Sequence, residues 1–110
     1  MANARIDTVT LTGIINQCFG FATDGRVSPS DQQTFLIEGK RLRGLLLNLL
    51  SAQFDDGTAA FATASAALST VNKKLSKDAT ALANVAATLD GIATLVGNLD
   101  KLLSIAMNFV

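Results

Sequence analysis

The side chains that could do chemistry in this sequence are few, and they are carboxylates and one thiol. The chain has nine Asp and Glu residues and one cysteine, Cys18, but no His and no Tyr. General acid–base and nucleophilic catalysis need a base or nucleophile held beside a partner that tunes its pKa. Cys18 lies in an apolar stretch with no such base, so we predict a small buried residue there. We therefore predict that the protein is not an enzyme.

The acidic residues form no recognisable metal or phosphate motif. Asp55 and Asp56 are adjacent, but a hard-cation site needs several converging oxygens, so the role of a helix end is favoured. The segment 24–26 lacks the ligand spacing of a calcium loop, and there is no glycine-rich phosphate loop. We predict no metal, no cofactor and no catalytic residue.

Composition limits the class of partner. Apolar residues make up 49% of the 110-residue chain and charged residues 16%, with a net charge of zero. Nucleic-acid binding needs a basic surplus, so this balance argues against it. No segment is apolar enough over about 20 residues to be a confident membrane span, although 79–99 comes near. No signal peptide is visible, and the cytoplasm is the default compartment.

Helix N-cap signals indicate two helices in the first half of the chain. Asp7 or Thr8 can cap a helix. A strand would need a partner, and none is evident. The helix would hold the apolar residues Leu11, Ile14, Ile15, Cys18, Phe19 and Phe21. Ser28 suits a helix N-cap and Pro29 the first helical position. We predict that this second helix runs through Phe54 and that residues 55–57 end it.

A heptad seam of apolar residues runs from Phe61 to Val110, with spacings that alternate between three and four. Past Thr94 a second apolar stripe opens beside the seam, at Leu95, Leu102 and Phe109. The predicted packing seam consists of Leu68, Val71, Leu75, Leu82, Val85, Leu89, Ile92, Val96, Leu99 and Leu103.

Two folds fit this seam. The seam keeps its phase across Asp78, and one helix over 58–108 would be roughly 75 Å long, which forces a helical hairpin to oligomerise. In the other fold, Lys77 ends one helix and Asp78 caps the next. We favour the second fold, an all-α antiparallel four-helix bundle with heptad-patterned C-terminal helices, in which residues 1–110 form a single domain.

The side of the C-terminal helices opposite the seam is unusually uncharged. Its small residues recur at helical spacing, which lets another backbone approach closely. Gly91 costs roughly 1 kcal/mol inside a helix relative to Ala and brings nothing locally. We interpret this side as a candidate partner face, made of Ala83, Ala87, Gly91 and Thr94.

The seam and the uncharged face together predict a non-catalytic helical interaction or assembly module. It would act by self-association as a homo-oligomer, or by binding a partner protein. Two alternatives remain open from the sequence. One is a membrane-active helical protein that forms pores or inserts into lipid. The other is a secreted helical filament subunit, which rests on composition alone.

Overall fold

Four helices make up most of the chain in a computed structural model that describes residues 3–55, 57–81, 85–105 and 108–109. They are α1 (Thr8–Ala22), α2 (Pro29–Leu49), α3 (Ala59–Ala81) and α4 (Val85–Leu103). The predicted all-helical fold is confirmed, and the C-terminal region contains two helices rather than one long helix. The molecule measures 45 × 20 × 19 Å.

Local side-chain chemistry explains where the helices begin. The Asp7 carboxylate accepts a hydrogen bond from the Thr10 backbone N–H at 3.0 Å, which caps α1. Ser28 Oγ accepts from the Asp31 N–H at 3.3 Å, with Pro29 following as the first helical residue of α2. Both predicted starts are confirmed. Thr58 Oγ1 accepts from the Phe61 N–H at 3.3 Å and satisfies the first turn of α3 in the same way.

The end of the second helix was predicted wrongly. Helix α2 ends at Leu49, and residues 52–55 form a strand, β2 (Ala52–Asp55). Ala52 and Phe54 are fully buried and alternate with half-buried neighbours, which is the two-residue period of a strand. A continued helix would have placed Phe54 on the exposed side of α2, so the change of period buries an aromatic ring.

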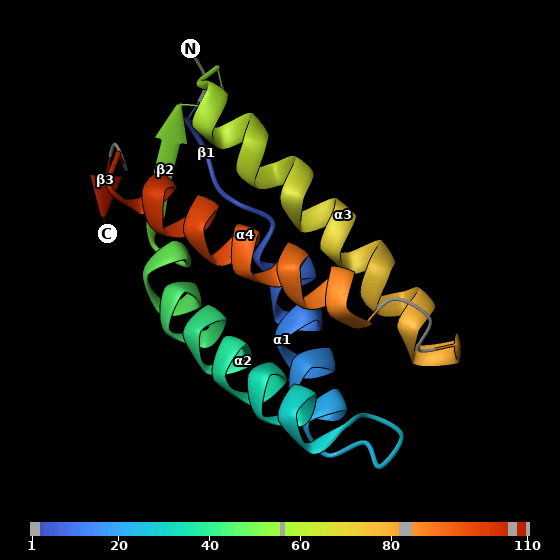
Figure 1. Ribbon diagram of the computed structural model, residues 1–110. Coiled ribbons are helices and arrows are strands. Elements are labelled where there is room, and N and C mark those ends of the chain that lie inside the picture. Colours follow the sequence, from blue (N-terminus) through green and yellow to red (C-terminus); the bar gives the residue numbers. More distant parts are fainter. Residues whose placement is uncertain (1–2, 56, 82–84, 106–107, 110) are drawn as a thin grey trace.

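Short strands near the two ends of the described chain both pair with β2, which forms a small three-stranded sheet (Figure 1). Strand β1 (Asn3–Ala4) pairs antiparallel with β2, with Ala4 opposite Phe54. Strand β3 (Asn108–Phe109) pairs with the other edge, with Phe109 opposite Ala52. The expectation of helix up to residue 108 is therefore wrong, because α4 ends at Leu103 and the chain enters this sheet.

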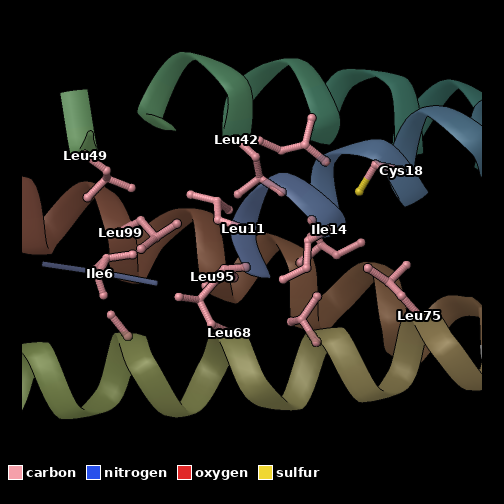
Figure 2. Close-up of a cluster of buried hydrophobic side chains, with 14 of the residues drawn as sticks. Ile6, Leu11, Ile14, Cys18, Leu42, Leu49, Leu68, Leu75, Leu95 and Leu99 are labelled. Atoms are coloured by element: carbon pink, nitrogen blue, oxygen red, sulfur yellow. The ribbon is translucent and has the colours of Figure 1, made fainter. Parts of the chain in front are cut away.

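One apolar cluster receives side chains from all four helices and from the segment before α1 (Figure 2). Helix α1 packs against α2 and α3, and α4 packs against α2 and α3. Figure 2 shows Leu11 and Ile14 of α1 between Leu42 of α2, Leu95 of α4 and Leu68 of α3. Each helix thus contributes one apolar face, and the opposite faces remain outside this cluster.

Candidate interaction surface

The predicted seam is buried along α3. Leu68, Val71 and Leu75 are at most 3% exposed. Ala64 and Asp78, which continue the same alternation of three and four on either side of them, are buried as well. Five consecutive positions with the predicted spacing therefore face the interior. The spacing alone was enough to orient this helix.

Along α4 the buried face is rotated from the predicted seam. Leu89, Ile92 and Leu99 of the seam are buried, but Val85, Val96 and Leu103 are only half-buried. The adjacent stripe, Leu95 and Leu102, is fully buried instead. Leu82 lies outside the described residues. Because α4 packs against α2 as well as α3, its buried face is wider than one seam and is centred between the two stripes.

Asp78 is not a helix cap, and that prediction is wrong. It lies inside α3, three residues before the last helical residue, and is 3% exposed. Its Oδ2 accepts a hydrogen bond from the buried Thr88 hydroxyl of α4 at 2.5 Å. A buried polar group without a partner costs about 1–3 kcal/mol, so this bond ties the two helices together at a fixed register.

Cys18 is buried between α1 and α2, as predicted (Figure 2). Burial, together with the negative charge of Glu38, raises the pKa of its thiol to about 12. The thiolate is the reactive form of cysteine, so Cys18 is a poor nucleophile at neutral pH. Glu38 is itself buried and accepts a hydrogen bond from Arg41 Nη1 at 3.1 Å.

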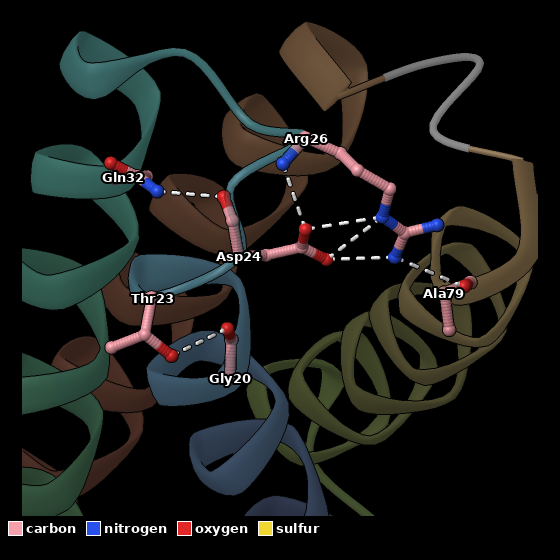
Figure 3. A network of polar contacts seen from close by, with 6 residues as sticks. All are labelled: Gly20, Thr23, Asp24, Arg26, Gln32 and Ala79. Atoms are coloured by element: carbon pink, nitrogen blue, oxygen red, sulfur yellow. Dashed lines mark hydrogen bonds and ion pairs between the residues drawn. The ribbon is translucent and has the colours of Figure 1, made fainter.

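An exposed ion pair closes the loop between α1 and α2 against α3 (Figure 3). The Arg26 guanidinium holds the Asp24 carboxylate, with a shortest contact of 2.7 Å, and its Nη2 also donates to the Ala79 carbonyl at 3.4 Å. The hydrogen bonds from Arg26 lower the pKa of Asp24 to about 2. Gln32 Nε2 donates to the Asp24 carbonyl at 2.6 Å. These contacts hold the loop between α1 and α2 in place against α2 and α3.

The predicted partner face partly lines a groove between α3 and α4. Ala87 and Thr94 are exposed, whereas Gly91 is half-buried, and Ala83 lies outside the described residues. The groove has a volume of about 480 Å³, and Lys74 and Asp90 are the charged residues that line it. A Cβ atom at Gly91 would lie 3.6 Å from Val71 Cγ2, an ordinary contact distance. Part of this face is therefore covered by α3 of the same chain.

A second groove lies on the other side of α4, against α2. Its volume is about 340 Å³. Gly44 of α2 and Gly97 of α4 both line it, and a Cβ atom on either glycine would have no other atom within 4 Å. Leu45 and Val96 supply its apolar part, and Arg41 and Asp100 are its charged members. This groove combines open space, apolar lining and both signs of charge.

Exposed apolar side chains concentrate on α2 and its C-cap. Of the six large hydrophobic residues described as exposed, four are here: Leu36, Ile37, Leu47 and Leu50, with exposed fractions of 38, 43, 69 and 49%. Lys40 and Arg43 are exposed on the same helix, and Arg43 lies over the Phe19 ring at 5.4 Å. The four apolar side chains thus form two pairs, in the N-terminal half and at the C-terminal end of α2, with exposed basic residues between them.

No family model, no curated protein and no solved structure matches this chain. The site must therefore be interpreted from its own geometry. Within the described residues, no helix is both long and apolar enough to cross a membrane. In the same part of the chain, no three potential metal-ligating side chains lie together.

The outer residues of α2 are the part of this surface that the sequence reading missed. A signal was present: Phe35, Leu42 and Leu49 recur every seven residues and define a buried face. Leu36 and Leu47 fall about 100° or more away from that face on a helix of 3.6 residues per turn.

Proposed function

We propose that this protein is a non-catalytic helical interaction module that acts through self-association or by binding a partner protein. The observation that carries the proposal is the concentration of exposed Leu and Ile side chains at α2 and its C-cap, the same helix that lines one side of the α2–α4 groove. Burying such side chains on association gains roughly 25 cal/mol per Å² of apolar surface removed from water.

The architecture that best serves this function is an antiparallel four-helix bundle. Short connections support it, because six residues join α1 to α2 and three join α3 to α4, and short loops favour antiparallel neighbours. Such a bundle presents α2 and α4 side by side as one outer layer. Both helices would then contribute to a single binding surface.

Sedimentation velocity over a concentration series, combined with hydrophobic-dye binding, tests this proposal. We expect a mass above that of the monomer at the higher concentrations, or dye fluorescence that reports an exposed apolar surface. The test variant is Leu47→Ser, which removes the most exposed leucine of α2 and should reduce the signal. The matched control is Val9→Ser on α1, where the valine is 83% exposed. A strict monomer that binds no dye would contradict the proposal.

A second candidate function is binding to an anionic lipid surface. The observation that favours it is the position of Lys40 and Arg43 among the exposed apolar residues of α2. Interfacial helices combine an apolar face with basic residues that contact lipid headgroups. Flotation with vesicles that contain phosphatidylserine, against neutral vesicles as control, tests it. Loss of binding in a Lys40→Gln/Arg43→Gln variant is the expected result.

A further inference from the structure

Exposed side chains of α2 form one line along the helix. Spacings that alternate between four and three residues keep side chains on the same side of a helix. Arg43 lies over the Phe19 ring at 5.4 Å, so this line borders α1 and not the α2–α4 groove. Its five exposed members, which we call the α2 stripe, are Leu36, Lys40, Arg43, Leu47 and Leu50.

Helix α4 presents a second exposed stripe with the same spacing and opposite properties. It forms the ridge between two grooves, because Asp90 lines the groove against α3 and Asp100 lines the groove against α2. The α2 stripe carries three leucines and two cations, whereas this one carries three small residues and two carboxylates. The five exposed members of this α4 stripe are Ala86, Asp90, Ala93, Gly97 and Asp100.

We propose that the α2 stripe of one copy of this chain packs along the α4 stripe of a second copy. The inference rests on the proposed function and names its partner. Because the two stripes have the same spacing in the same order, they match position by position when the two helices run parallel. The facing pairs are then Leu36 with Ala86, Lys40 with Asp90, Arg43 with Ala93, Leu47 with Gly97, and Leu50 with Asp100.

Large side chains lie opposite small ones in this arrangement. Leu47 is 69% exposed, and a Cβ atom at Gly97 would meet no other atom within 4 Å. Alanine and glycine on one helix let a neighbouring helix approach closely, so the leucines of the other helix make close contacts. Each leucine that is covered in this way gains roughly 25 cal/mol per Å² of apolar surface removed from water.

The charges of the two stripes are also complementary. Lys40 faces Asp90 in the matched arrangement. At the far end of the α2 stripe, Arg5 Nη1 donates to the Leu50 carbonyl at 3.2 Å, which places a guanidinium where Asp100 of the second copy arrives. Opposite charges that meet across a contact steer association and fix its register.

Cations of the same chain also lie near the two carboxylates of the α4 stripe. Lys74 lines the same groove as Asp90, and Arg41 lines the same groove as Asp100. Lys101 follows Asp100 but lines a hollow against α3. The two ion pairs found among the described residues involve neither carboxylate. Asp90 and Asp100 therefore keep the capacity to pair with cations of another chain.

Other occupants fit the α2 stripe less well. Pairing of this stripe with its own copy would bring Lys40 and Arg43 of two chains together at the middle of the contact, and facing like charges cost energy. In an interfacial helix the basic residues flank an apolar face, whereas here they lie between the leucines. An acidic helix with small residues is the better complement, and α4 is such a helix.

The contact joins copies head to tail, because the two stripes lie on different sides of the molecule. Such a contact leaves one stripe open on each outer copy, so a third copy can add and a ring or filament can form. One contact is a single helix against a single helix, roughly 21 Å long, and is smaller than the about 800 Å² per partner of a standard interface. We therefore expect weak, reversible association with masses beyond the dimer.

Charge reversal on either stripe tests the contact. One double variant is Lys40→Glu/Arg43→Glu on α2, and the other is Asp90→Lys/Asp100→Lys on α4. A matched pair of single variants is Lys40→Glu and Lys73→Glu, because Lys73 is exposed on α3 and lies off both stripes. Light scattering follows the mass over a concentration series at about 0.01 M and about 1 M salt, where the Debye length is about 30 and 3 Å.

We expect the wild type to associate at low salt and to do so about tenfold more weakly at high salt. Each double variant alone should stay monomeric, since its two stripes carry the same charge. Mixing the two double variants in equal amounts should restore association, because each α2 stripe then meets an α4 stripe of opposite charge. Lys40→Glu should weaken association and Lys73→Glu should not. Circular dichroism checks that all variants stay helical.

Several results would overturn the inference. If the double variants associate as the wild type does, or if their mixture does not recover association, the contact lies elsewhere and the proposed function stands. A mass that stops at the dimer would exclude the head-to-tail arrangement. If the wild type is monomeric but binds dye or phosphatidylserine vesicles, the second copy is not the occupant. If it is monomeric and binds neither, the inference and the proposed function both fail.

Discussion

The α1–α2 contact and the α2–α4 groove use glycine in opposite ways. At Gly39 a Cβ atom would lie 3.0 Å from Cε1 of Phe19 and 3.2 Å from the Cβ of Cys18, so the two helices can approach only because the side chain is absent. The rings of Phe21 and Phe35 stack beside this point with centroids 5.1 Å apart. Around Gly44 and Gly97 the space stays open.

This difference separates residues that serve the fold from residues that do not. A helix glycine at a close contact is explained by the contact, and its conformational cost is offset there. A helix glycine in open space lowers stability without an intramolecular benefit. The α1–α2 contact therefore belongs to folding, whereas Gly44 and Gly97, like Gly13 and Gly20 of α1, leave space that the fold itself does not use.

We expect the largest effect on stability at the α1–α2 contact. Phe35 is fully buried and stacked on Phe21, so Phe35→Ala should lower the free energy of unfolding by about 3–5 kcal/mol. Leu47→Ala, on the groove side, should change it by less than about 0.5 kcal/mol because the leucine is mostly exposed. Urea denaturation measures both. Equal effects would remove the distinction between the two regions.

Thr88→Val tests the polar contact between α3 and α4. The variant removes the hydroxyl that donates to the buried Asp78 carboxylate and should cost about 1–3 kcal/mol. Replacing both residues, with Asp78→Leu and Thr88→Val together, should restore most of the loss, because no buried polar atom of the pair is then left unpaired. Additive losses in the double variant would show that the pair is not coupled.

Gly39→Ala should destabilise the protein by about 1 kcal/mol, because overpacking of about 1–3 kcal/mol exceeds the gain in helix propensity. Gly91→Ala, whose new methyl group would sit at ordinary contact distance from Val71 and Lys74, should instead stabilise it by about 0.5–1 kcal/mol. Thermal unfolding of both variants gives the signs. If Gly39→Ala stabilised the protein, the α1–α2 contact would have space for a methyl group, and close packing would not explain the glycine.

The smallest effect concerns the loop that joins α1 to α2. The pKa of Asp24 falls to about 2 in the folded protein, from an ordinary value of 3.8. Its contribution to stability is therefore complete above pH 4 and is lost as the pH falls toward 2. Asp24→Asn should flatten the stability profile in this window, with slightly lower stability than the wild type at pH 7, where the exposed ion pair is lost, and equal stability near pH 2. Identical acid-unfolding curves would contradict the assignment.

The features that depend on nearby residues could be predicted from the sequence. The caps at Asp7 and Ser28 and the buried face of α3 follow from nearby residues, and the structure agrees with each. The rotation of α4 was not predictable from its own spacing, because it depends on packing against α2. The strand at Ala52–Asp55 was missed because its partners come from the two ends of the chain.

The candidate surface was predicted only in part. Ala87, Gly91 and Thr94 were expected to form the partner face, and they line a groove between α3 and α4; whether a partner binds there stays a prediction. The α2–α4 groove needed three-dimensional information. Gly44 and Gly97 belong to helices far apart in the sequence, and only their packing reveals that both face one hollow.

The most direct test of the whole account is the double variant Gly44→Ala/Gly97→Ala, measured for its unfolding free energy and for its self-association. Two alanines in open helix positions should stabilise the monomer by about 1–2 kcal/mol in total. The same methyl groups fill part of the α2–α4 groove, so self-association through this groove should weaken by about tenfold. A protein that is stabilised and also dissociated is the predicted result. A stabilised variant that dimerises as the wild type does would contradict the account.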